Sequence, residues 1–151
     1  MTEWTQITVA IAVALNGERE EGRHQLLVCW QTTTDTDHAQ RCVLAHYLAD
    51  LEADLADEVA WDERALAAAY HRVSDTELAP IGITSAAGLA PSLHLNLGHG
   101  YLRQGRVREA RTQLDAGLAS SGTLADDGYG NLIRRGLNGL EQRVAAAETE
   151  G

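Results

Sequence analysis

Residues 91–122 read PSLHLNLGHGYLRQGRVREARTQLDAGLASSG and form the most informative part of the chain. Their apolar side chains recur at three- and four-residue steps, the spacing that places them on one face of a helix. Pro91 suits a first helical turn, and Gly105 interrupts the period as a residue that ends a helix does. The stretch predicts two short antiparallel helices, in which the small residues Gly98 and Ala110 let the backbones approach closely.

This pattern resembles the tetratricopeptide repeat, a helix-turn-helix unit with the consensus W-x₂-L-G-x₂-Y, then A-x₃-F, then P. The corresponding residues are His94, Leu97, Gly98, Tyr101, Ala110, Leu114 and Gly122. The chain departs from the consensus where His94 replaces Trp, Leu114 replaces Phe and Gly122 replaces Pro. The resemblance implies an array of helical hairpins whose first helices line a concave surface that grips a partner segment. It implies no catalysis, and a fold alone does not establish a function.

The same template fits the earlier part of the chain more loosely. Residues 3–34 form a weaker copy, with small residues at Gly17 and Gly22 where the template needs them. Residues 36–74 fit its first half but carry Glu52 where Gly closes the first helix, so we expect two longer helices with a displaced turn.

The remaining segments complete the predicted fold. Residues 75–90 show no clear period and predict one long connection, whereas residues 124–148 predict a closing helix of the kind that a stacked array needs. We therefore expect an all-α, right-handed array of antiparallel hairpins, about seven helices in a single domain over residues 1–151. Its expected parts are repeat-like pairs at 3–34, 36–74 and 91–122 and a C-terminal capping helix at 124–148.

Composition narrows the classes of partner. The 12 basic residues, all Arg, and 22 acidic residues give a net charge of −10, which argues against binding to nucleic acid. The apolar stretch from Ile7 to Leu15 is shorter than the ~20 residues that span a bilayer, and it follows Glu3 rather than a basic segment. We expect a soluble cytoplasmic protein with no membrane partner, in which Cys29 and Cys42 are reduced thiols.

In the tetratricopeptide family, the groove-facing positions lie on the first helix of each pair. Carrying these positions over residue by residue nominates seven side chains for a peptide-binding groove: Cys42, His46, Asp50, Leu95, Asn96, His99 and Arg103. His46 and His99 then occupy equivalent places, as do Asp50 and Arg103. We hypothesise that Asn96 holds a partner's backbone amide, that Arg103 holds a carboxylate, and that the histidines make binding sensitive to pH near 6 to 7.

A metal site is the competing interpretation of one helix. His38, Cys42, His46 and Asp50 step by four, and the first three are weak candidates for zinc ligands. Each step turns the direction by about 40°, so the four side chains cannot converge, and a site needs a ligand such as His99 or His71. We therefore predict no metal and no cofactor. The alternative function is a small homo-oligomeric or metal- or pH-responsive helical regulator whose His/Cys stripe is the sensor.

Signals for catalysis are weak throughout. The chain has no nucleophile elbow, phosphate-binding loop or dinucleotide fingerprint. Adjacent carboxylates such as Asp62 and Glu63 point in different directions on a helix, which is typical of a solvated face. We expect a non-enzymatic protein- or peptide-binding module.

Charge is unevenly distributed along the chain. The middle pair is acidic, whereas the last pair is locally basic at Arg103, Arg106, Arg108 and Arg111. Such runs usually serve solvation. The alternatives are a head-to-tail homodimer of opposite patches or an acidic partner that binds the Arg cluster.

Overall fold

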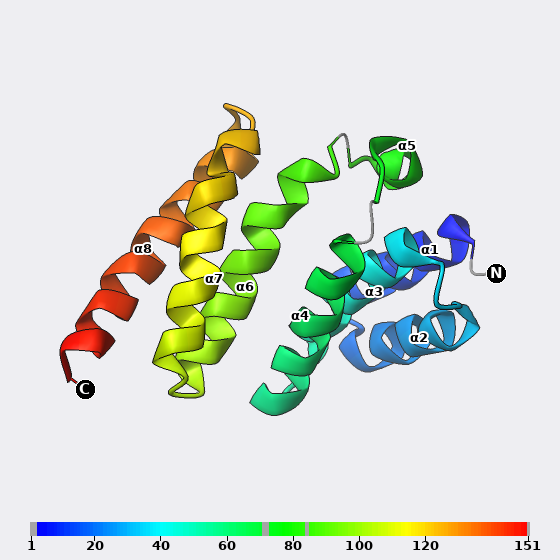
Figure 1. The fold of residues 1–151 in the computed structure, drawn as a ribbon. Coiled ribbons are helices and arrows are strands. Elements are labelled where there is room, and N and C mark those ends of the chain that lie inside the picture. The colour runs from blue at the N-terminus through cyan, green and yellow to red at the C-terminus, as the bar shows by residue number, and fades with distance from the viewer. Residues whose placement is uncertain (1–2, 71–72, 84, 151) are drawn as a thin grey trace. The chain divides into compact units, whose positions relative to one another are not determined.

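The computed structural model describes residues 3–70, 73–83 and 85–150. Eight α-helices and three short 3₁₀ helices lie in these ranges, and no strand does (Figure 1). The all-α prediction is confirmed. The chain divides into two compact units, Met1–Ala86 and Ala87–Gly151. We call them unit 1 and unit 2 and describe each by itself.

Unit 1 contains two long helical hairpins. The hairpins are formed by α1 (Trp4–Leu15) with α2 (Arg19–Thr32), and by α3 (His38–Leu51) with α4 (Leu55–Ala69). Short connections join the two helices of each pair, which pack antiparallel (Figure 1). The large side chains with no measurable exposure come from both hairpins and the segment after them: Ile7, Leu26, Leu44, Leu48 and Leu78.

Small residues build the α1–α2 hairpin. Gly17 lies in the turn with φ +94°, a conformation that side chains with a Cβ rarely adopt. A Cβ placed on Gly22 would lie 2.5 Å from the Cβ of Ala14 and 2.6 Å from its Cα. The two helices therefore touch at backbone distance, which only glycine at this position of α2 permits.

The α3–α4 hairpin corrects the prediction of longer helices with a displaced turn. Helix α3 has 14 residues, the same length as α6, and Glu52 directly follows its end. Glu52 has an extended backbone (φ −83°, ψ 133°), so this turn does not need a glycine. The carboxylate of Asp54 then accepts the N–H of Asp57 at 3.0 Å and caps α4.

The predicted long connection contains ordered structure. Helix α5 (Asp75–Leu78) starts with a capping box, in which Ser74 accepts the N–H of Glu77 and the Glu77 carboxylate accepts the N–H of Ser74. Leu78 is fully buried. The S-x-x-E signature was present in the sequence, but the surrounding Gly and Pro residues masked it. The 3₁₀ helices η1 (Ala79–Ile81) and η2 (Ala87–Leu89) follow.

Unit 2 is a hairpin with one further helix. It contains α6 (Ala90–Arg103), α7 (Val107–Ser120), the short η3 (Ser121–Thr123) and α8 (Gly128–Glu150). Gly105 has φ +77° in the α6–α7 turn. A Cβ on Gly98 would lie 3.5 Å from the carbonyl oxygen of Ala110 and 3.0 Å from Leu140 on α8. The close approach predicted at Gly98 and Ala110 is confirmed, and α8, the predicted closing helix, packs against both α6 and α7.

Replacing Gly22 by Ala tests the backbone contact in unit 1. The added methyl group meets backbone atoms that cannot move aside, so we expect Gly22→Ala to lower the free energy of unfolding of unit 1 by about 1–3 kcal/mol. Chemical denaturation followed by circular dichroism measures the change. Gly122→Ala, where an added Cβ meets nothing within 4 Å, is the matched control. Equal stability of the two variants would contradict the close approach.

Candidate functional site

Cys42 of α3 is a core residue. Its side chain is 1% exposed, and burial raises the pKa of its thiol to about 12. A neutral, covered thiol offers neither a surface for a docking peptide nor a thiolate for a metal ion. The structure therefore places this predicted groove residue inside unit 1.

His46 and Asp50 lie one turn apart on α3 but in different surroundings. His46 is half-buried, and its Nδ1 is buried with no hydrogen-bond partner. Burial lowers the pKa of the imidazole, and the exposed carboxylate of Asp50 opposes that effect only in part. The net direction of the pKa shift is downward from the ordinary value, and the predicted sensitivity of binding near pH 6 to 7 stays a prediction.

Asp62 of α4 is a buried carboxyl group that the sequence interpretation missed. It is 4% exposed, whereas its neighbour Glu63 is exposed, so a solvated face is wrong for Asp62. Burial, and then the negative charges of Glu58 and Asp50, raise its pKa to about 7. The available signal was its spacing, because Asp62 lies three residues from the buried Val59 and three from the buried Ala65.

The α3–α4 and α6–α7 hairpins differ at the positions of His46 and Asp62. Counted from the helix starts, His46 is the ninth residue of α3 and Gly98 is the ninth residue of α6. Asp62 is the eighth residue of α4, as Leu114 is of α7. Counted in this way, a titratable group lies in α3–α4 where α6–α7 has a glycine or a leucine. The equivalence of His46 and His99, which follows the repeat template, stays a prediction.

The remaining predicted groove residues lie on α6 in unit 2. Leu95 is half-buried and faces α8, because a Cβ on Gly136 would lie 2.6 Å from its Cδ2. Asn96 is half-buried, and His99 and Arg103 are exposed. The spacing of these three places them along one side of α6. A groove shared with Cys42, His46 and Asp50 would combine residues from both units and stays a prediction.

No metal centre is assembled in the part of the chain that the structure describes. Three or more His, Cys, Asp or Glu side chains that could hold an ion do not come together there. The weak candidates His38, Cys42 and His46 are therefore not a ligand set in this structure. The further candidate His71 lies outside the described residues.

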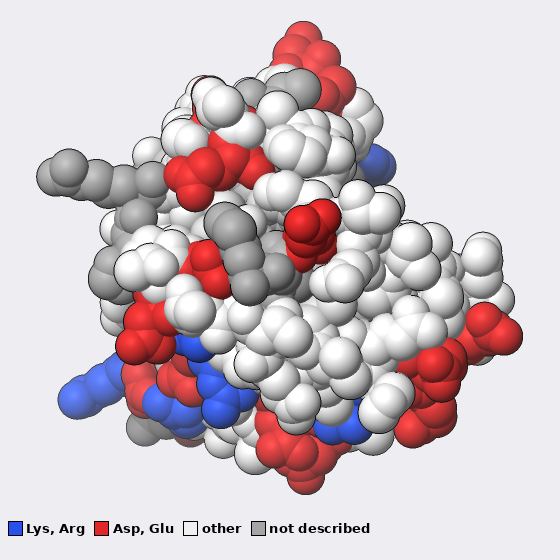
Figure 2. Space-filling model, turned by 90° about the vertical axis from the view of Figure 1, so that its right-hand side faces the viewer, with Lys and Arg blue, Asp and Glu red and all other residues white. Residues whose placement is uncertain are grey.

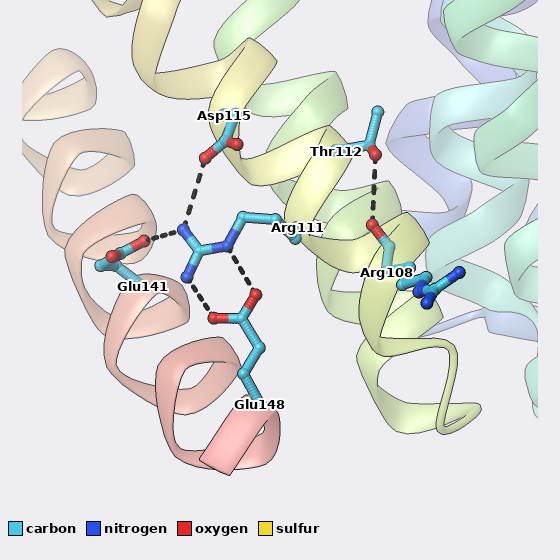
Figure 3. Close-up of polar contacts among 6 residues, drawn as sticks. All are labelled: Arg108, Arg111, Thr112, Asp115, Glu141 and Glu148. Carbon is cyan, nitrogen blue, oxygen red and sulfur yellow. Dashed lines mark hydrogen bonds and ion pairs between the residues drawn. The ribbon is translucent and has the colours of Figure 1, made fainter. Parts of the chain in front are cut away.

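The arginines of the last pair are largely engaged within unit 2. Arg111 of α7 donates two hydrogen bonds to Glu148 (3.0 and 2.6 Å) and one to Glu141 (2.7 Å), both on α8, and it also contacts Asp115 (Figure 3). These hydrogen bonds raise the pKa of the guanidinium above its ordinary value. Arg106 pairs with Glu109 and its guanidinium lies over the ring of Tyr101. Internal carboxylates thus occupy groups that the sequence offered to an acidic partner.

An apolar surface lies on the first hairpin. Helix α1 has no charged residue, and its Val9 and Leu15 are 54% and 73% exposed. Figure 2, viewed from the side where α1 and α2 lie in Figure 1, shows broad uncharged areas between patches of acidic side chains. Among the described helices, none combines the length and the apolar composition that crossing a bilayer requires.

Comparison with known proteins gives no relative. The chain matches no protein-family model, no curated protein and no solved structure. No relative therefore suggests a function for these residues, and a proposal depends on this chain alone.

Chemical labelling tests whether both thiols are buried. Burial raises the pKa of Cys29 as well as that of Cys42, so we expect a disulfide reagent to leave both thiols of the native protein unmodified at pH 8 over minutes. Both react once urea unfolds the chain. An added thiol at the exposed Ala119 (Ala119→Cys) is the positive control and labels at once. Rapid native labelling of Cys42 would contradict its place in the core.

Hydrogen exchange tests whether the ion pairs of Arg111 hold α8 on α7. We expect Arg111→Gln to lower the protection of backbone amides in residues 141–150 of α8 by roughly three- to tenfold, because three carboxylates lose their shared cation. Arg108→Gln removes the same charge one turn earlier on α7 and is the matched control. Equal protection in the two variants would show that the ion pairs do not hold α8 on α7.

Proposed function

We propose that this chain is a non-enzymatic binding module of the tetratricopeptide type, which holds a protein or peptide partner in the cytoplasm. The observation that carries the proposal is the division of α6 into two sides. Leu97, Gly98 and Tyr101 are buried in unit 2, while Asn96, His99 and Arg103 lie along another side of the same helix. Short hairpins with a glycine in the turn and a small residue at the closest approach support the repeat assignment.

The chemistry of the α6 stripe suits an extended peptide. The carboxamide of Asn96 offers both a donor and an acceptor, which match the N–H and C=O of a peptide backbone. The guanidinium of Arg103 suits a carboxylate, and a hydrogen bond between charged groups contributes about 1.5–3 kcal/mol. The helix backbone that carries these side chains is already ordered by packing, whereas the exposed side chain of Arg103 loses rotamer freedom when a partner binds.

A regulator that responds to pH is the second candidate. The buried titratable groups of the α3–α4 hairpin favour it, since Asp62 is a buried residue and Nδ1 of His46 is buried without a hydrogen-bond partner. The metal-responsive form has less support, because the described residues assemble no set of three ligands. A homodimer through opposite charges is a further proposal, which sedimentation at low and high salt tests.

Peptide selection against the full-length chain tests the α6 stripe. Peptides selected from a random display library are titrated by fluorescence anisotropy against the parent protein and its variants. We expect Arg103→Ala to weaken peptides that contain a carboxylate by about tenfold or more, and Asn96→Ala to weaken binding regardless of peptide charge.

Two controls make this test specific. Arg135→Ala and Asn138→Ala remove the same side-chain types from exposed positions of α8 and should leave the affinities unchanged. Circular dichroism verifies that all four variants fold. Affinities that do not differ among the α6 variants, the α8 variants and the parent would contradict the proposed function.

A further inference from the structure

We propose that Asp62 and His46 form a buried two-proton switch in unit 1. Helix α4 is held on α3 while Asp62 carries a proton and His46 does not, and the packing loosens when Asp62 loses its proton or His46 gains one. The switch lies within one hairpin and needs no peptide partner. It therefore stands or fails independently of the proposed binding function.

The first support is the burial of both groups. Asp62 is 4% exposed, and no hydrogen bond or ion pair to its carboxyl group occurs among the described residues. Nδ1 of His46 is buried and also has no hydrogen-bond partner. Buried polar atoms in folded proteins are nearly always satisfied, so Nδ1 of His46 is exceptional, and it lies in the same hairpin as the buried residue Asp62. Both groups can avoid the larger cost of a buried charge only by staying neutral.

The second support is the sign of the surrounding charges. Glu58 lies one turn before Asp62 on α4, and Asp50 acts on Asp62 from α3. His46 lies one turn before Asp50 on α3, and the negative charge of Asp50 raises the pKa of His46 as well. One carboxylate therefore interacts electrostatically with both groups. Ionised Asp62 would therefore add a third negative charge to this cluster.

Among the described residues, the charges that shift the pKa of Asp62 are the negative ones of Glu58 and Asp50. Arg19 of α2 donates to the backbone carbonyl of Asp50 at 3.0 Å. Arg23 of α2 donates to Glu52 at 2.7 Å. Arg64 of α4 lies over the ring of Trp61, 4.5 Å from its centroid, and Arg41 of α3 lies over the ring of Trp30. Each of these guanidinium groups interacts with a residue other than Asp62. The proton on Asp62 is therefore the means by which its carboxyl group becomes neutral.

The two groups affect stability with opposite signs. Because the pKa of Asp62 is raised to about 7, its stabilising contribution is complete below the unfolded value near 4 and is lost as pH rises to about 7. Because the pKa of His46 is lowered, its contribution is present above the unfolded value near 6.5 and is lost as pH falls through the folded value. The two effects partly cancel in the parent protein, and removing either group exposes the other.

Hydrogen exchange of the full chain, corrected for intrinsic exchange rates, measures the open population of the α3–α4 hairpin from pH 5 to pH 8. We expect His46→Asn to open more as pH rises, by up to about tenfold per pH unit below pH 7. We expect Asp62→Asn to open more as pH falls below 6.5. The amides of α8 serve as an internal reference, because the buried residues of that helix are glycine and apolar residues only.

Further variants separate the switch from a general effect of charge or misfolding. Asp57→Asn removes one exposed carboxylate from the first turn of α4 and should retain the parent's pH dependence. Asp62→Leu copies the eighth residue of α7 and should behave as Asp62→Asn does, which covers a failure of the amide variant to fold.

Carbon-13 NMR gives a direct readout that does not depend on any variant. In the parent protein, the side-chain carboxyl carbon of Asp62 should titrate near pH 7. Titration below pH 5 overturns the proposal. Matching pH slopes in the His46→Asn and Asp62→Asn variants overturn it as well.

Discussion

The structure depends on how closely two antiparallel helices can approach. At Gly22 and Ala14 in unit 1, the distance leaves no room for another methyl group, and Gly98 lies close to the carbonyl oxygen of Ala110 in unit 2. Such contacts require a side chain of one hydrogen or one carbon at the crossing point. Glycines with positive φ at Gly17 and Gly105 let the chain reverse within a few residues. Together these constraints produce two similar hairpins from dissimilar sequences.

The α3–α4 hairpin reaches the same architecture with other means. Its turn uses an extended Glu52 and the capping carboxylate of Asp54 in place of a left-handed glycine. Trp61 packs edge-on against Trp30 of α2, 4.9 Å between ring centroids, and joins this hairpin to the first one. The large rings bury area that small residues do not, and the same interior includes the carboxyl group of Asp62. Stability and proton binding are therefore coupled in this hairpin, whereas α6–α7 has apolar or small residues at the corresponding places.

Charge in this protein serves two roles that a linear sequence does not separate. The guanidinium of Arg111 holds α8 on α7 through Glu141 and Glu148, and it is a structural group although it belongs to a basic cluster (Figure 3). Arg103 belongs to the same cluster and lies exposed on α6, where our proposed binding surface uses it. The two arginines differ in exposure, because Arg111 is half-buried. The distinction comes from residues about 30 to 37 positions away along the chain.

The sequence alone determined most of the helices and the close approach at Gly98 and Ala110. Periodicity and small residues located α1, α2, α3, α4, α6, α7 and α8, because helix formation and hairpin turns depend on neighbours within a few positions. Tertiary structure decided which polar side chains stay in water. Cys42 and Asp62 are covered by side chains from other turns and helices, and Leu95 faces Gly136, some 40 residues later. Burial sets the chemistry of a thiol, a carboxyl group or an imidazole, and burial depends on contacts that no local pattern encodes.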